Sequence, residues 1–285
     1  MRNGKQIVLI TGANSGFGLL TAVELVKQGF FVIATMRNVE KNGDLLKLIQ
    51  EHGYENSLDF QPLDVTKENQ IRELKQYVFE KYGGIDILIN NAGYCLGGVV
   101  EDVSMEDWKQ QFETNFFGTV AVTKAFLPSL REKRSGKIIN MGSISGQFGF
   151  PGMAPYTSSK FAVAGFSESL RLELLPFNIY VSLVEPGAYK TKIWDKSLGE
   201  IKLDIESDYY PFLVGIFDEA KKSASNAADP MEVVNTIIKI CVTPSPRFRY
   251  PIGKGAKVIS LLKKTVPWPV VEWAVRRSIG KSREL

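Results

Sequence analysis

A tyrosine and a lysine four residues apart form the pair in this chain best suited to acid–base chemistry. Tyr156 and Lys160 open a stretch of helical periodicity, and residues i and i+4 share one face of a helix. A phenol ionises near pH ~10 in water, and a nearby ammonium group favours its phenolate. The pair could therefore exchange a proton with a substrate nearer neutral pH. Taken alone, the same spacing is more typical of an exposed helix surface.

A glycine-rich segment near the start of the chain favours a phosphate-bearing ligand. Residues 11–18 read Thr-Gly-Ala-Asn-Ser-Gly-Phe-Gly and stand between an apolar strand and a helix. Glycines permit a tight turn and the close approach of a ligand, and the following helix offers backbone N–H groups to a dinucleotide pyrophosphate. The spacing is G-x-x-x-G-x-G rather than G-x-G-x-x-G. A strand-to-helix turn without a ligand is the alternative.

The end of the second expected strand indicates which dinucleotide is bound. NAD sites usually place an acid there, which accepts a hydrogen bond from the ribose 2′-hydroxyl. Residues 34–38 read Ala-Thr-Met-Arg-Asn, and the first acid is Glu40. Arg37 could pair with a 2′-phosphate through charge-assisted hydrogen bonds, although an ordinary exposed arginine is the alternative. We therefore predict NADP(H) rather than NAD(H).

The elements that must position these residues alternate between strand-like and helix-like segments. We expect strands at residues 6–10, 30–35, 58–63, 86–89, 137–141, 180–184 and 247–252, and helices at residues 17–28, 41–51, 67–81, 108–131, 156–175 and 231–241. Near-continuous apolar strands between helices predict a parallel sheet covered on both faces. The expected fold is a single α/β domain of residues 1–285, a doubly wound Rossmann-like fold with about seven mostly parallel strands.

One long segment departs from this rhythm. Residues 189–228 are mixed in charge and rich in aromatics, and we expect this insertion to cover the ligand at the carboxyl edge of the sheet. Together with residues 147–155, it should wall an apolar substrate. The candidate wall residues, for which core packing is the alternative, are Phe148, Phe150, Met153, Trp194, Phe212 and Phe217.

The C-terminal segment is basic and amphipathic. The net charge is +4, but ten Lys and Arg face two Glu from residue 247 onward, so the remainder carries 25 basic against 29 acidic residues. Residues 256–285 also hold Trp268 and Trp273, with Pro267 and Pro269 interrupting the pattern. Packing against the body or a partner subunit is the favoured interpretation, and peripheral contact with an anionic membrane surface is the alternative. We expect no nucleic-acid partner.

Composition excludes several other classes of protein. Cys95 and Cys241 provide neither a disulfide framework nor metal-type spacing. His52, the only histidine, stands far from the other candidate residues, so we predict no metal site. No signal peptide is evident, and no stretch approaches the roughly eighteen apolar residues that span a bilayer. These features predict a cytoplasmic protein.

The ordered set of motifs resembles the short-chain dehydrogenase/reductase family, nearest to its hydroxysteroid and retinol dehydrogenase-like members. The resemblance runs from about residue 6 to about residue 195. It is carried by the turn at residues 11–18, Asp64-Val65, Asn90-Asn91-Ala92-Gly93, Asn115, Ser143, Tyr156 with Lys160, Pro186-Gly187 and Thr191. Each motif is weak evidence alone, but their combination in this order is specific.

The resemblance implies four catalytic residues. Tyr156 would exchange the hydroxyl proton, while Lys160 would hold the nicotinamide ribose and lower the pKa of Tyr156. Ser143 would hydrogen-bond the substrate oxygen, and Asn115 would bind a water that relays protons. Ser145 is the competitor of Ser143, which lies thirteen residues before Tyr156, as in the family.

The resemblance also implies a cofactor-binding set and a reaction. The cofactor-binding positions would be Gly12, Asn14, Ser15, Gly16, Phe17, Gly18, Arg37, Asp64, Val65, Asn91, Ala92, Gly93, Tyr156, Lys160, Pro186, Gly187 and Thr191. The expected enzyme is a homodimer or homotetramer that transfers hydride between NADP(H) and a hydrophobic carbonyl or secondary alcohol, steroid-, retinoid- or lipid-like. An NADP(H)-binding regulator or scaffold without turnover is the alternative, and the presence of Ser143, Tyr156 and Lys160 disfavours it.

Overall fold

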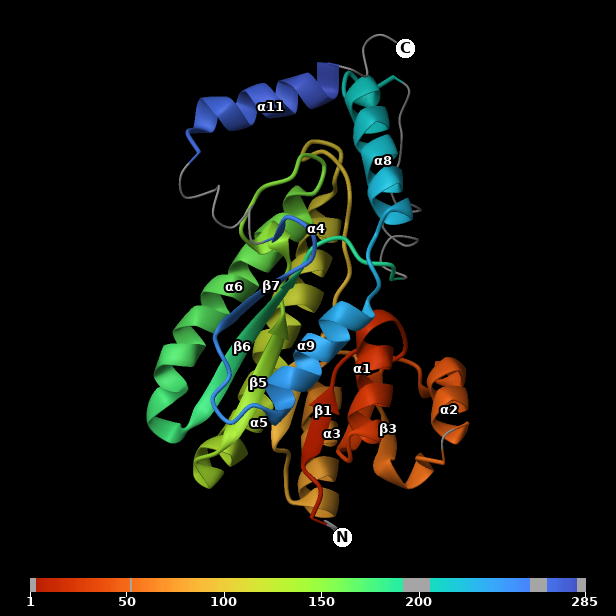
Figure 1. The fold of residues 1–285 in the computed structure, drawn as a ribbon, viewed down its shortest axis with the longest axis vertical. Helices are drawn as coiled ribbons and strands as arrows, with labels where there is room; N and C mark the ends of the chain where they lie inside the picture. Colours follow the sequence, from red (N-terminus) through yellow and green to blue (C-terminus); the bar gives the residue numbers. More distant parts are fainter. Residues whose placement is uncertain (1–3, 52, 192–205, 257–265, 281–285) are drawn as a thin grey trace.

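Seven parallel strands form one sheet in the order β3-β2-β1-β4-β5-β6-β7 (Figure 1). The computed structural model describes residues 4–51, 53–191, 206–256 and 266–280. The strands are β1 (Ile7–Ile10), β2 (Phe31–Met36), β3 (Leu58–Pro62), β4 (Ile87–Asn90), β5 (Gly136–Met141), β6 (Ile179–Pro186) and β7 (Arg249–Ile252). The expected α/β sheet of about seven strands is confirmed.

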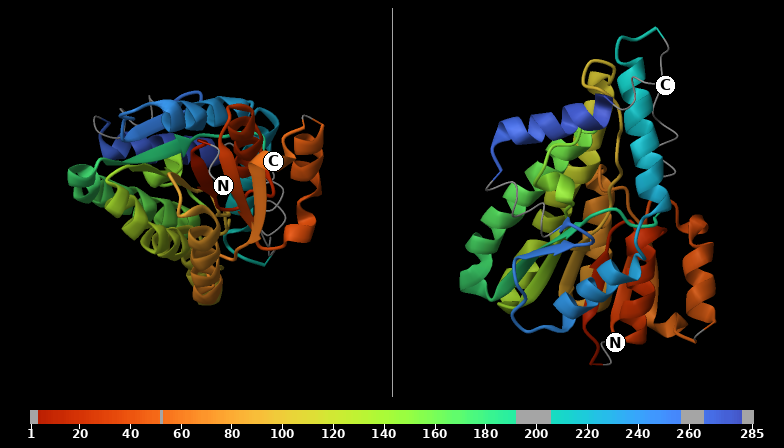
Figure 2. Two further views of the ribbon diagram at one scale, coloured as in Figure 1. Left: turned by 90° about the horizontal axis from the view of Figure 1, so that it is seen from below. Right: turned by 45° about the horizontal axis from the view of Figure 1, so that its top comes forward.

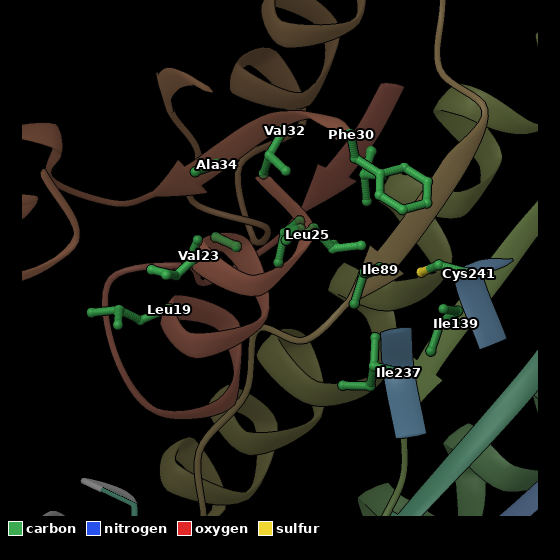
Figure 3. Packing of buried hydrophobic residues seen from close by; sticks show 14 of the residues in the cluster. Leu19, Val23, Leu25, Phe30, Val32, Ala34, Ile89, Ile139, Ile237 and Cys241 are labelled. Atoms are coloured by element: carbon green, nitrogen blue, oxygen red, sulfur yellow. The ribbon is translucent and has the colours of Figure 1, made fainter. Parts of the chain in front are cut away.

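Helices cover both faces of this sheet and enclose two apolar cores (Figure 2). On one face lie α1 (Gly16–Lys27), α2 (Gly43–Gln50) and α9 (Met231–Val242), and on the other lie α3 (Glu68–Tyr82), α5 (Gly118–Lys133) and α6 (Ala154–Leu174). Figure 3 shows Leu25 of α1 and Ile237 of α9 among side chains of the strands. Strands buried on both faces explain the continuous apolar runs of the sequence.

The strand order brings the motifs to one place. β1 pairs with β2 on one side and with β4 on the other, so the chain crosses over between β3 and β4. In open α/β sheets, ligands bind outside the carboxyl ends of the strands at such a reversal. The glycine turn follows β1 and residues 91–93 follow β4, so both meet at this position.

The expected helix at residues 108–131 is corrected by the structure. Helix α4 (Met105–Phe112) begins earlier, where the Ser104 hydroxyl accepts a hydrogen bond from the Asp107 N–H. A π-helical turn, Glu113–Phe117, then separates α4 from α5. The turn accommodates an extra residue in the hydrogen-bond ladder, and Asn115 lies inside it.

Two more helices lie beyond the carboxyl edge of the sheet (Figures 1 and 2). Helix α8 (Tyr210–Ser225) occupies much of the expected insertion, where no helix was predicted. Helix α11 (Trp268–Gly280) contacts α8 and includes Pro269, which corrects the expectation that this proline interrupts the pattern. His52, Trp194 and the side chain of Phe212 lie outside the described residues.

No helix within the described ranges is both long and apolar enough to cross a membrane.

Candidate active site

The glycine turn after β1 is held in place by the segment that follows β4. The Thr11 hydroxyl accepts hydrogen bonds from the backbone N–H groups of Asn91 and Ala92, each at 3.0 Å. The Asn91 side-chain amide donates to the carbonyls of Thr11 and Gly12, at 3.0 and 2.9 Å. Asn91 was predicted to line the cofactor, and its amide in fact fixes the turn. Thr11 was not among the predicted site residues.

The turn itself leaves little room for side chains. Gly12 has a φ of +67°, and a Cβ there would lie 2.9 Å from the Ala92 Cα. A Cβ on Gly18 would lie 2.4 Å from the Gly12 carbonyl oxygen. Ser15 precedes α1 without a side-chain capping bond, so the first N–H groups of the helix are open to an acceptor. The predicted residues Asn14 and Phe17 belong to the same turn and are exposed and half-buried, respectively.

The segment after β6 lies beside this turn. Pro186 ends β6, and the Gly187 N–H donates to the Ile252 carbonyl at 2.9 Å. A Cβ on Gly16 would lie 3.6 Å from the Thr191 Cβ, so the structure brings Thr191 to the glycine turn as expected from its motif. Tyr189, which was not predicted, is buried with its ring 5.9 Å from that of Phe17.

The predicted residues on the adenosine side follow β2 and β3. Arg37 is exposed directly after β2. The Asp64 carboxylate accepts from the Thr66 hydroxyl at 2.8 Å and from its N–H at 3.0 Å, which makes a local turn. Val65 is buried, and a Cβ on Gly118 would lie 2.6 Å from its Cγ2. Val65 therefore also fixes the packing of α5.

Ser143, Tyr156 and Lys160 converge at the carboxyl end of β5, and each is buried. The Ser143 side chain hydrogen-bonds the Tyr156 phenol, and its oxygen accepts from the Ser145 N–H at 3.1 Å. Ser143 rather than Ser145 therefore faces Tyr156. The Lys160 ammonium donates to the Met141 carbonyl at 2.7 Å and lies 5.7 Å from the centroid of the Tyr156 ring.

Burial changes the protonation of this pair. It raises the pKa of Tyr156, Cys95 adds to the effect, and the hydrogen bond from Ser143 opposes it. Burial lowers the pKa of Lys160 to about 8. The expected lowering of the Tyr156 pKa by Lys160 is therefore not observed. The phenolate loses its hydration in the protein interior, and the Lys160 ammonium is directed to the Met141 carbonyl.

Asn115 joins the π-helical turn to α6. Its side-chain oxygen accepts from the Tyr94 N–H at 3.1 Å, and its amide donates to the Tyr94 carbonyl and the Ser159 hydroxyl, both at 3.0 Å. The Ser159 hydroxyl donates to the Tyr156 carbonyl at 2.7 Å. The Asn115 carbonyl accepts from Thr119. Asn115 thus ties the loop after β4 to the helix that carries Tyr156.

Buried polar residues beneath the site include Asn90 of the predicted motif and three that were not predicted, Asn140, Ser167 and Glu185. Asn90 donates to Asn140 at 2.8 Å, and Asn140 donates to Ser167 at 2.9 Å, so β4, β5 and α6 are linked. Glu185 of β6 is fully buried and accepts from Arg249 at 2.9 Å. Burial raises the pKa of Glu185. In the sequence, the polar residues at positions 90, 140 and 185 within apolar strands were the available signal.

Helix α8 and two loops lie above this group. A Cβ on Gly152 would lie 3.0 Å from the Ile216 side chain of α8, and Gly98 forms a parallel bridge with Met153. The predicted wall residues Phe148 and Phe150 are half-buried, with ring centroids 5.7 Å apart. Phe217 of α8 is also half-buried. Apolar side chains from α8 and residues 147–153 therefore lie at the same end of the molecule as Tyr156.

The described residues contain no group of three or more His, Cys, Asp and Glu side chains placed to hold a metal ion.

Comparisons with known proteins agree with the geometry. The family model described as short chain dehydrogenase matches residues 6–201. The chain is 45% identical to the uncharacterized oxidoreductase YusZ of Bacillus subtilis, over 96% of this chain and 99% of the relative. It is 37% identical to a 3-ketodihydrosphingosine reductase of Bacteroides thetaiotaomicron, over 95% and 97% of the two chains. It is also 34% identical to human retinol dehydrogenase 8, over 87% and 82%.

A solved structure shows the same architecture. A short-chain dehydrogenase from Streptomyces avermitilis superposes with a TM-score of 0.81 at 31% identity, and the match covers 95% of this chain and 96% of the other.

Proposed function

Because the chain belongs to the short-chain dehydrogenase/reductase family, we propose that it transfers hydride between NADP(H) and an apolar carbonyl or secondary alcohol, with Tyr156 as the general acid or base. The observation that carries the proposal is the buried convergence of Ser143, Tyr156 and Lys160 at the carboxyl end of β5, next to the segment after β4, where a Cβ on Gly93 would lie 3.9 Å from the Lys160 nitrogen. The family membership supports an oxidoreductase acting on CH–OH or C=O groups.

The glycine turn fits a dinucleotide. Gly12 and Gly18 allow a turn so tight that a Cβ at either position would clash with the protein, and the uncapped start of α1 offers N–H donors to a pyrophosphate. Arg37 is exposed at the end of β2, where an acid would select NAD(H), and it would hold a 2′-phosphate there. Thr191 and Lys160 would hold the nicotinamide half. The cofactor, when bound, supplies or accepts the hydride.

The protein residues handle the proton and the oxygen. The raised pKa of Tyr156 keeps its phenol protonated near neutral pH, so the phenol can donate to a carbonyl oxygen during reduction. Ser143 adds a second hydroxyl donor for the negative charge that develops on that oxygen. Lys160, which has a pKa of about 8, is mostly cationic at pH 7. Its positive charge favours return of a proton to the Tyr156 phenolate after the phenol has donated. Asn115 keeps Tyr156 in position through Ser159.

Two observations support an apolar substrate. Ile216, Phe217 and the aromatics of residues 147–153 lie above the catalytic residues. The two relatives named for their activities are named for 3-ketodihydrosphingosine and for retinol, both lipophilic.

A regulator without turnover is disfavoured because the full set of acid–base residues is present. The proposed assembly is a homodimer or homotetramer, and the exposed Phe161 and Leu172 of α6 offer an apolar contact for it.

The test is turnover of a panel of apolar ketones and alcohols with NADPH and with NADH. We expect turnover that prefers the phosphorylated cofactor. Replacing Arg37 with Asp should reduce the NADPH-to-NADH ratio of kcat/KM by about 10- to 100-fold, the loss of one charge-assisted contact. Arg72→Asp, which alters an exposed arginine of α3, is the matched control and should leave the ratio unchanged. An unchanged ratio in Arg37→Asp would refute the role given to Arg37, a wild type that prefers NADH would refute the NADP(H) assignment, and cofactor binding without turnover would favour the regulator.

A further inference from the structure

Helix α11 carries large apolar side chains that the other described residues leave uncovered. Trp268, Val270 and Trp273 are 64%, 51% and 59% exposed. Val271 and Val275 are only partly exposed, and α11 contacts α8. By helical spacing, Val271 and Val275 lie on the side of α11 that packs against the body, and Val270 and Trp273 lie on the opposite, outward side. Trp268 is exposed at the first turn of the helix.

Arg276 and Arg277 lie on the same outward side of α11 as Trp273. Arg277 follows Trp273 by one helical turn, and its guanidinium lies 5.4 Å from the centroid of the Trp273 ring. Arg276 follows Trp268 by about two turns and is exposed. Glu272 is the one exposed acid on this helix within the described residues. The outward face thus combines indole rings with a positive charge, as in helices that lie at the boundary between lipid headgroups and acyl chains.

The charge distribution of the chain distinguishes a lipid surface from other occupants of this face. The segment from residue 247 onward has eight more basic than acidic residues, whereas the preceding part is acidic by four. Within the described part of α11, Arg276 and Arg277 outnumber the single acid Glu272. An anionic surface would attract this helix and orient the molecule with α11 toward it.

Helix α11 lies at the end of the molecule that carries the catalytic residues. Both α11 and α8 lie beyond the carboxyl ends of the strands, the end that carries Tyr156 (Figures 1 and 2). A surface bound to α11 would therefore face the same end of the molecule as the catalytic group.

We propose that the outward face of α11 docks on an anionic lipid surface, with Trp268 and Trp273 in the headgroup region and Arg276 and Arg277 contacting lipid phosphates. The docking is independent of the enzymatic activity. That this docking lets the enzyme take a lipophilic substrate directly from the lipid rests on the proposed function.

The experiment is co-sedimentation of the full chain with vesicles of phosphatidylglycerol mixed with phosphatidylcholine, and with vesicles of phosphatidylcholine alone. The wild type should sediment with the anionic vesicles, and high salt should weaken the association. Trp268→Ser/Trp273→Ser should lower the partition coefficient by roughly tenfold or more, because two buried indoles are lost. Val270→Ser and Val242→Ser form a matched pair, because the two valines are 51% and 57% exposed. We expect Val270→Ser to weaken binding to anionic vesicles and Val242→Ser to bind like the wild type.

Charge reversal provides a second, independent test. Arg276→Glu/Arg277→Glu should lower the partition coefficient by about 30-fold or more, which corresponds to roughly 1 kcal/mol for each basic residue at the surface. Arg72→Glu/Arg131→Glu changes the net charge equally at exposed sites on α3 and α5, and it should bind like the wild type. Thermal unfolding establishes that each variant is folded.

Three results would overturn the proposal. The wild type could remain equally in the supernatant with and without anionic vesicles. The α11 variants and their controls could bind alike. The tryptophan variants could lower the molar mass in solution, which would make this face a subunit contact. Turnover of a water-soluble ketone with NADPH is measured in parallel, and it reports on the proposed function without depending on vesicles.

Discussion

Two regions of the molecule are built in different ways: the edge of the sheet that carries the glycine turn and the segment after β4, and the end that is capped by α8 and α11. At the edge, polar side chains are joined across long stretches of chain: Asn91 fixes the glycine turn, and Asn115 ties the loop after β4 to α6. In the capping helices, the prominent side chains are apolar, and Trp268 and Trp273 are exposed. Buried hydrogen bonds thus fix the geometry of the candidate site, whereas the capping helices present apolar and basic side chains to the surroundings.

The largest effect that this comparison predicts is at Tyr156. Tyr156→Phe removes the proton donor but keeps the ring, so turnover should fall by about 100- to 10,000-fold. NADPH binding, measured by tryptophan quenching, should stay close to that of the wild type because the glycine turn is intact. The corresponding change in the capping end, Tyr209→Phe at an exposed site, should retain turnover of small ketones. Comparable losses of turnover in Tyr156→Phe and Tyr209→Phe would contradict the division of roles between the two regions.

The second prediction concerns pH and Lys160. Burial lowers its pKa to about 8, below the value near ~10.4 in an unfolded chain. Between these pH values, the unfolded state holds a proton that the folded state has lost, so the Lys160 contribution to the free energy of unfolding increases with pH. Lys160→Met should be more stable than the wild type by up to about 3 kcal/mol near pH 7. This advantage should vanish toward pH ~10.5, as urea unfolding would show, and a pH-independent difference would contradict it.

The third prediction compares the stability of the two regions directly. Asn115→Ala leaves the Tyr94 N–H and the Ser159 hydroxyl without this partner, which should lower the free energy of unfolding by about 1–3 kcal/mol. Trp273→Ser removes a 59% exposed side chain and should change it by less than about 0.5 kcal/mol. Chemical denaturation of both variants measures the contrast. A larger loss at Trp273 would show that α11 is packed more tightly than its exposure indicates.

Much of the fold and the catalytic group could be predicted because their signals are local. The apolar strand runs predict a buried parallel sheet, and Tyr156 and Lys160 lie at a helical spacing. The π-helical turn could not be predicted, because one additional residue in the ladder leaves the apolar periodicity of residues 108–131 almost unchanged. Helix α11 was obscured by Pro269, yet the first turn of a helix tolerates proline because its N–H has no intrahelical acceptor there.

The protonation of Tyr156 needed the three-dimensional structure. Sequence spacing places a cation near the phenol, which favours the phenolate. The structure adds burial, which dominates and raises the pKa. The contact of Asn91 with the glycine turn was also hidden, since the hydrogen bond from its amide to the Gly12 carbonyl joins residues that are 79 positions apart. Distant contacts of this kind follow from strand order, and residue spacing does not contain them.

The most direct test of the central claim follows the hydride itself. The protein is incubated with an apolar ketone and NADPH that carries deuterium at either C4 position, and the alcohol is examined by mass spectrometry. We expect one of the two labelled cofactors to place deuterium on the carbinol carbon, and Tyr156→Phe to reduce the labelled product by about 100-fold or more. NADPH binding without label in the product, across the ketone panel, would contradict an oxidoreductase built on Ser143, Tyr156 and Lys160.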